Sequence, residues 1–208
     1  MRAFRDLSKV YPSIFEFGRI TEQIFFISAK KSGLFSDVYH SDEKTDLFHR
    51  IDFIATTTDG QKLFIDVKAR RRRKRCGRDW AIVIEIFNKN GKRVSEKRFT
   101  HYAFENPFEK SFWIIPKKDI HNFVRKELIR RGAEILRYPE YFHLYQREKD
   151  VCYILPEEYF FEKITHMVKA QIDLSDGSVR KLWNRREEII NETIKRCGKI
   201  QGYARRYS

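Results

Sequence analysis

Two aspartates and a lysine stand in strand-like runs at a spacing that could bind a divalent cation and a phosphate. Asp66 and Lys68 form an Asp-x-Lys motif, and Asp52 lies fourteen residues upstream. Side chains alternate across a strand, so Asp66 and Lys68 are expected on one face. Carboxylates bind hard cations, and an ammonium group can neutralise a phosphate. The alternative is an ordinary salt-bridged or solvated sheet face.

The two runs that carry these acids predict an antiparallel hairpin. The first run spans residues 47–55 and the second 62–68, with an Asp-Gly pair at 59–60 that is typical of a tight turn. Pairing these strands would bring the two aspartates close to Lys68. Acids set in such apolar runs are costly to bury unless they are paired or bind a metal. The pattern therefore favours a site over a solvated sheet face.

Directly after this motif comes the densest charge run in the chain, which consists of Arg70, Arg71, Arg72, Arg73, Lys74 and Arg75. Such a run cannot pack in a core. Because it leaves the end of the strand that carries Lys68, we expect it to contact nucleic-acid phosphates with strong salt dependence. A localisation-type cluster or a disordered loop is the alternative. Arg50 would share a face with Asp52, and could pair with it or contact a phosphate.

Composition agrees with a polyanionic partner. The 208 residues include 43 Lys and Arg against 29 Asp and Glu, which gives a net charge of +14 and favours nucleic acid. The 41% apolar content predicts a globular protein. Cys76, Cys152 and Cys197 lack the spacing of a zinc site, so we expect free thiols in a reducing compartment. With no signal peptide and no stretch of membrane-spanning length, we expect a cytoplasmic protein without membrane contact.

The elements that must position these residues follow from periodicity and turn signals. We expect helices at 13–32, 118–131 and 178–197, a helix opening at 156, and extended segments at 34–40, 80–87, 99–104, 111–116, 138–145 and 151–156. Glu22 lies at the edge of the apolar stripe of the first helix and could reach the aspartates, with Glu16 as the competing candidate. Glu85 interrupts an apolar strand and is either paired, for example with a basic residue of the run at 70–75, or part of the site. We expect an α/β core at 1–132 and a C-terminal extension at 133–208.

Together these features resemble the PD-(D/E)XK nuclease superfamily over roughly residues 13–130. The core of that family runs helix, three-stranded meander, helix, strand, with an acid on the second strand and acid-x-lysine on the third. Asp52 matches the first acid, and Asp66 and Lys68 match the second half-motif. Ile51 stands where many members have the proline that names the motif. The resemblance implies a restriction-endonuclease-like mixed central sheet flanked by helices, followed here by a mainly helical extension.

The resemblance also implies a function. It suggests a nuclease that hydrolyses phosphodiester bonds in DNA, with Mg²⁺ or Mn²⁺ held by Asp52, Asp66 and the carbonyl of Val67. Glu22 would assist through water or a second ion, and Lys68 would orient the attacking water or stabilise the transition state. Members that cut both strands are often dimers, so a homodimer is one expectation. Two other interpretations stay open: a nucleic-acid-binding protein on the same fold with little or no cleavage, and a basic protein that binds another protein.

Overall fold

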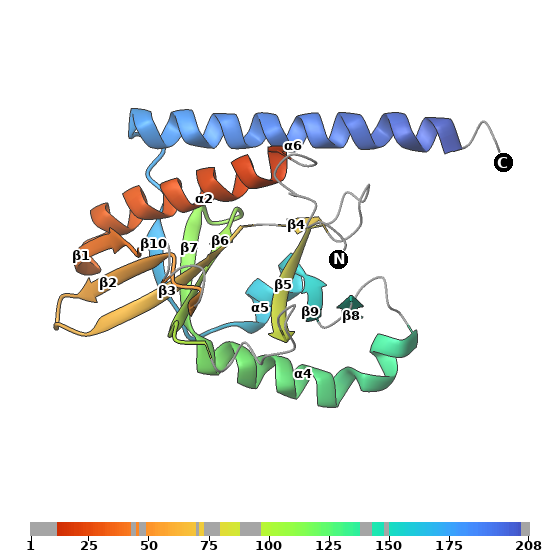
Figure 1. The fold of residues 1–208 in the computed structure, drawn as a ribbon, viewed down its shortest axis with the longest axis horizontal. Coiled ribbons are helices and arrows are strands. Elements are labelled where there is room, and N and C mark those ends of the chain that lie inside the picture. The colour runs from red at the N-terminus through yellow and green to blue at the C-terminus, as the bar shows by residue number, and fades with distance from the viewer. Residues whose placement is uncertain are drawn as a thin grey trace, which may run out of the picture.

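The computed structural model describes residues 12–42, 45, 49–69, 71–72, 80–87, 97–137, 143–147 and 150–204. Within these ranges the fold is mixed α/β, as predicted. It consists of two sheets and the helices that cover them (Figure 1). None of the described helices is long and apolar enough to cross a membrane.

The larger sheet contains the predicted hairpin at its centre. Its strands, in spatial order, are β1 (Phe35–His40), β2 (Phe53–Thr57), β3 (Lys62–Lys68), β6 (His101–Asn106), β7 (Ser111–Pro116) and β10 (Val168–Gln171). Neighbours are antiparallel except for β3 and β6, which are parallel. The edge strand β10 was not predicted. It has only four residues and buries only Ala170, so its alternation of apolar and polar residues is too short to be a clear signal.

The smaller sheet lies in the connection between β3 and β6 and in the C-terminal part of the chain. Its spatial order is β4 (Arg71–Arg72), β5 (Trp80–Phe87), β9 (Asp150–Pro156) and β8 (His143–Arg147), and all its pairs are antiparallel. The resemblance implies a helix between the third strand of the meander and the next strand. The described residues of that connection instead form β4 and β5, so the chain departs from the expected order there.

The described helices are α2 (Pro12–Lys31), α4 (Lys117–Arg137), α5 (Glu157–Lys163) and α6 (Gly177–Ala204). The first helix agrees with its prediction to within a residue at each end. The other two long helices run past their predicted ends, through Gly132 and Gly198. A glycine inside a helix costs only about 1 kcal/mol relative to alanine, which good helix formers on both sides outweigh. Glycine was therefore a misleading stop signal in both places.

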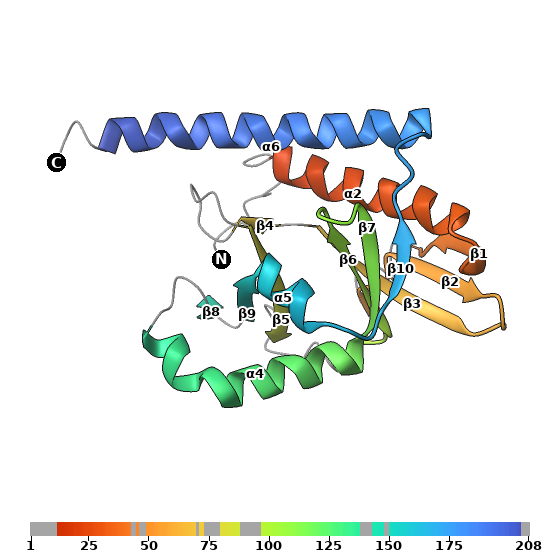
Figure 2. The ribbon, with the colours of Figure 1, turned by 180° about the vertical axis from the view of Figure 1, so that it is seen from behind.

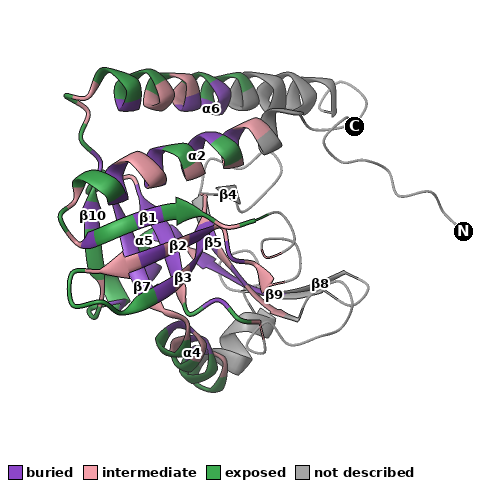
Figure 3. Cartoon of the chain, turned by 60° about the vertical axis from the view of Figure 1, so that its left-hand side comes forward, coloured by how far each residue is buried: buried purple, intermediate pink, exposed green. Residues whose placement is uncertain are grey.

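The helices cover the large sheet in two layers. Helix α6 runs alongside α2 above one face, whereas α4 lies on the opposite side of the molecule (Figures 1 and 2). One apolar core fills the space under α2 and α6, with Phe25, Phe53 and Ile65 fully buried. A second core lies against the other face of the sheet and includes Tyr102 and Phe160. Much of the sheet is buried, whereas the outer face of the described part of α6 is exposed (Figure 3).

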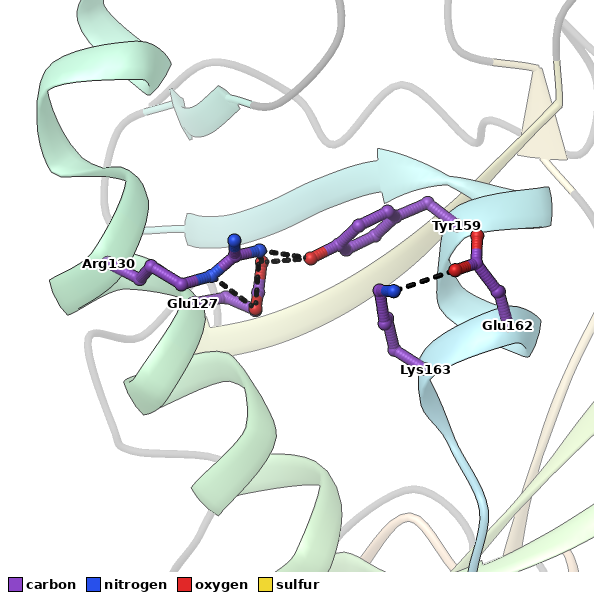
Figure 4. Close-up of polar contacts among 5 residues, drawn as sticks. All are labelled: Glu127, Arg130, Tyr159, Glu162 and Lys163. Carbon is purple, nitrogen blue, oxygen red and sulfur yellow. Dashed lines mark hydrogen bonds and ion pairs between the residues drawn. The ribbon is translucent and has the colours of Figure 1, made fainter.

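A polar contact joins α4 to α5 at the rim of the second core. Glu127 of α4 accepts hydrogen bonds from Arg130 at 3.0 Å and from the hydroxyl of Tyr159 at 2.8 Å (Figure 4). Glu127 is buried, so these donors compensate a carboxylate that would otherwise be costly to bury. The contact connects the helix after β7 to the helix after β9, and so ties the C-terminal segment to the core.

Arg186 attaches α6 to the large sheet through a buried ion pair with Glu105 of β6. The side chains of Arg186 and Glu105 are 0% and 1% exposed. The guanidinium also lies over the rings of Trp183 and Phe17, at 4.6 and 5.2 Å from their centroids. Residues after 132 therefore add strands to both sheets and a helix to the first core. They pack on the described part of residues 1–132, the segment expected to form the core.

We predict that Arg186→Met lowers the free energy of unfolding by about 3–5 kcal/mol, because it removes one partner of a buried ion pair and leaves the buried carboxylate of Glu105 without that cation. Urea denaturation measures the loss. Arg185→Met is the matched control, because the neighbouring Arg185 pairs with Glu16 at the surface and its loss should change stability only slightly. Adding Glu105→Gln to Arg186→Met should recover most of the stability. Equal losses for the two arginine variants would contradict this account.

Candidate active site

A pocket of about 270 Å³ opens at the C-terminal end of β3, between α2 and β5. The residues that line it come from several separate parts of the chain: Gly18, Glu22, Arg50, Asp52, Asp66, Val67, Lys68, Ala69, Ile82, Val83, Glu85 and Phe104. Both aspartates and the lysine of the sequence motif are among them. The structure therefore brings together the three residues whose spacing suggested a site.

Asp52 lies immediately before β2, opposite Asp66 across the hairpin. Its backbone N–H donates to the carbonyl of Ile65 at 2.9 Å, and its carboxylate Oδ2 accepts from the N–H of Val67 at 2.6 Å. The predicted strand was expected to begin at residue 47, but β2 begins at Phe53. The side chain of Asp52 accepts the hydrogen bond from the N–H of Val67. In a longer strand, a backbone carbonyl would accept that bond instead.

Asp66 carries the most deeply buried carboxylate of the pocket. The residue is 3% exposed, and its Oδ1 accepts a hydrogen bond from Lys68 Nζ at 2.7 Å. This contact confirms that Asp66 and Lys68 share a face, while Leu63, Ile65 and Val67 point into the first core. The other oxygen, Oδ2, is buried and has no hydrogen-bond partner among the described residues. A buried carboxylate oxygen without a hydrogen-bond donor is costly unless a bound ligand or ion supplies a partner.

The surroundings favour the protonated forms of both acids. Burial, followed by the charge of Asp66, raises the pKa of Asp52 well above its usual value. Burial also raises the pKa of Asp66, although the nearby ammonium of Lys68 acts in the opposite direction. Two neighbouring buried carboxylates whose pKa values are both raised favour the binding of a cation between them.

Glu22 lines the pocket from α2, and its charge contributes to the raised pKa of Asp52. Glu16, the competing candidate, points elsewhere and accepts a hydrogen bond from Arg185 of α6 at 2.7 Å. The two glutamates are six residues apart, which places them on different sides of the helix. The geometry therefore favours Glu22 as the acid that α2 contributes to the pocket.

Arg50 pairs with Glu85 of β5 across the pocket. The sequence left open whether Glu85 was paired, with the basic run as the suggested source of its partner, or part of the site. It is both paired and in the pocket, but its partner precedes the hairpin. Of the basic run, the structure describes only the backbone of Arg71 and Arg72, in β4. The proposed phosphate contacts of Arg70, Arg73, Lys74 and Arg75 lie outside the described residues.

The pocket offers several oxygen donors to a divalent ion. No group of three or more His, Cys, Asp or Glu close enough to hold a metal occurs in the described part of the chain. Magnesium, however, needs only one or two carboxylates, because it keeps several waters and binds substrate phosphates. Four carboxylates and two cationic side chains line the pocket. The pocket is therefore locally negative, although the whole protein has a net charge of +14. This negative charge and the unpartnered Asp66 oxygen fit Mg²⁺ or Mn²⁺.

Tyr102 is a neighbour of the site that the sequence did not assign to it. It pairs with Asp66 in the parallel register of β3 and β6, is 1% exposed, and its hydroxyl has no hydrogen-bond partner in the described ranges. Burial, followed by the charges of Asp66 and Glu85, raises its pKa well above the usual value. The sequence showed Tyr102 in an extended segment, but only the parallel pairing of β3 with β6 places it beside Asp66.

No protein-family model, curated protein or solved structure matches this chain. The assignment of its site therefore depends on the residues and on their geometry.

We predict that Asp52→Asn stabilises the metal-free protein at neutral pH. Because the folded-state pKa of Asp52 is raised, the folded protein favours the protonated acid. The contribution of Asp52 to the free energy of unfolding is therefore present below about pH 4 and is lost as the pH rises through the folded-state pKa. The variant removes this loss and keeps an oxygen that can accept from Val67. Its unfolding midpoint in EDTA should match the wild type at low pH and exceed it increasingly towards neutral pH.

Asp59→Asn is the control for this experiment. Asp59 lies in the turn of the same hairpin, and a hydrogen bond from Thr57 lowers its pKa. A lowered pKa means that the ionised form of Asp59 stabilises the folded protein. The control variant should therefore gain no stability relative to the wild type as the pH rises. An Asp52→Asn variant that is less stable than the wild type at neutral pH in EDTA would show that the folded protein does not disfavour the ionised form of Asp52.

Proposed function

We propose that this protein is a divalent-metal-dependent nuclease that hydrolyses phosphodiester bonds in DNA. The observation that carries the proposal is the placement of Asp66, with one buried oxygen unpartnered among the described residues, beside Asp52 and Lys68 in one pocket. The strongly basic composition supports a nucleic-acid partner. The choice of DNA comes from the resemblance of the motif to the nuclease superfamily.

The carboxylates of Asp52 and Asp66 would hold the metal ion in this proposal. The N–H of Val67 points towards Asp52, and the N–H and C=O of one strand residue point to the same edge, so the carbonyl of Val67 is suited as a third ligand. Glu22 would act through water from α2. When bound, such an ion lowers the pKa of a coordinated water and neutralises charge on a phosphate.

Lys68 supplies the cationic group of the proposed reaction. Its ammonium has three donors, one of which is used by Asp66 Oδ1 at 2.7 Å. Its side chain is 21% exposed. The ammonium group is therefore held by Asp66 and is still accessible from the pocket. The remaining donors can orient a water molecule or bind a phosphate oxygen on which charge develops. Such fixed donors stabilise a transition state without reorganisation during the reaction.

Binding of the nucleic acid would depend on the cationic residues around the pocket. Arg50 lies in the pocket itself, and β4 begins at Arg71, three residues after Lys68. Phosphate contacts of this kind are independent of sequence and weaken with salt. The same surface would also serve a protein that binds nucleic acid without cleaving it, and this alternative differs from the proposal only in the chemistry at Asp52, Asp66 and Lys68.

We predict that the wild type cleaves DNA with Mg²⁺ or Mn²⁺, and that Lys68→Ala lowers the rate by at least about 100-fold, because a fixed donor to the transition state is lost. Plasmid, linear and branched DNA are incubated with each ion and with EDTA, and products are separated on gels. Lys163→Ala is the matched control, because this exposed lysine of α5 lies outside the pocket and forms an ion pair with Glu162.

Cleavage that persists in EDTA or in Lys68→Ala would contradict the proposed chemistry. Tight, salt-dependent binding without any cleavage by the wild type would instead assign the chain to the nucleic-acid-binding alternative.

A further inference from the structure

Arg50 is held in an uncommon conformation at the mouth of the pocket. Its backbone has φ of 55°, in the left-handed region that residues other than glycine rarely adopt. Its guanidinium donates a hydrogen bond to Glu85 of β5, and its side chain is 28% exposed. Such a conformation persists where the surroundings hold it, and it often occurs at functional sites. The contact with Glu85 is one interaction that can hold it.

A second carboxylate competes for the same guanidinium. Burial disfavours the charged form of Arg50, but the carboxylates of Glu85 and then Asp66 outweigh it and raise its pKa. Arg50 and Asp66 line the same pocket. The unpartnered oxygen of Asp66 is an acceptor that an arginine would satisfy well, because a guanidinium and a carboxylate match in geometry and charge. Arg50 nevertheless pairs with Glu85.

We propose that Glu85 is a positioning residue that holds Arg50 away from Asp66 and thereby keeps the metal site open. This inference rests on the proposed function, since it assumes that Asp66 binds a divalent ion. Without the carboxylate of Glu85, a partly buried guanidinium would lose its partner. It would then turn to another acceptor of the pocket, because an uncompensated buried charge is strongly unfavourable. The unpartnered oxygen of Asp66, whose carboxylate already acts on the charge of Arg50, is such an acceptor, and it is the oxygen that the ion needs.

The arrangement also explains why a cation is tolerated beside a cation site. Arg50 brings a positive charge into a pocket that must bind a second one, and Glu85 neutralises it locally. With its charge balanced by Glu85, the guanidinium keeps further donors for a phosphate that enters the pocket. Glu85 would thus separate two functions, phosphate binding at Arg50 and ion binding at Asp66.

A double-mutant cycle measured by Mn²⁺ titration calorimetry tests the inference in the absence of nucleic acid. Glu85→Gln should weaken Mn²⁺ binding by about 10- to 100-fold, as loss of an outer partner of a metal ligand typically does. In an Arg50→Gln background, the same substitution should change the affinity by less than about threefold, because no guanidinium remains to move. If Glu85 acted only through its own charge, the fold-change would be the same in both backgrounds.

A second variant separates charge from position. Glu85→Asp keeps the negative charge but shortens the side chain, so it should weaken Mn²⁺ binding only if the contact with Arg50 matters. It also serves if Glu85→Gln proves too unstable to titrate. Glu188→Gln is the control, because it removes a carboxylate that pairs with an arginine, Arg185, outside the pocket. It should leave Mn²⁺ binding unchanged.

The outcomes distinguish this inference from the function on which it rests. A wild type that does not bind Mn²⁺ would overturn the proposed function and the inference together. A wild type that binds Mn²⁺, with equal effects of Glu85→Gln in both backgrounds and no effect of Glu85→Asp, would overturn the role of Glu85 alone.

Discussion

The burial of the Asp66 carboxylate is the constraint around which the site is organised. Asp66 lies at the end of β3 with 3% of its surface exposed, in a position where an ionised group is unfavourable without compensation. The chain supplies one donor, from Lys68, and leaves the other oxygen without a partner among the described residues. Arg50, the nearby guanidinium that could fill the gap, pairs with Glu85 instead. The pocket therefore contains a buried carboxylate oxygen for which the described chain supplies no hydrogen-bond donor.

The two layers of the fold produce this burial. Helix α2 covers one face of the large sheet and brings Glu22 to the pocket, while β5 approaches from the other side with Glu85. Helix α6 packs against α2 and is fixed to β6 through Arg186 and Glu105. The C-terminal segment thus has a structural consequence for the site. It holds the layer from which Glu22 reaches the pocket, although it contributes no lining residue that the structure describes.

The local parts of this arrangement could be predicted from the sequence, and the non-local parts could not. The hairpin, the shared face of Asp66 and Lys68, and the proximity of Asp52 depend on alternation and on one turn, which neighbouring residues determine. The pair of Arg50 with Glu85 joins residues 35 positions apart, one in the segment before β2 and the other on β5 of the smaller sheet. The place of Tyr102 depends on the parallel pairing of β3 with β6. Periodicity indicates neither which strands pair nor which face of β5 meets the pocket.

The central claim is that Asp52 and Asp66 together bind a divalent cation. Anomalous diffraction from crystals of the protein grown with Mn²⁺ tests it most directly, because the scattering locates the ion without reference to activity. A peak is expected in the pocket, within coordination distance of a carboxylate oxygen from each aspartate, and it should be lost in Asp66→Asn. A pocket without a peak at saturating Mn²⁺, or a peak that persists in Asp66→Asn, would contradict it.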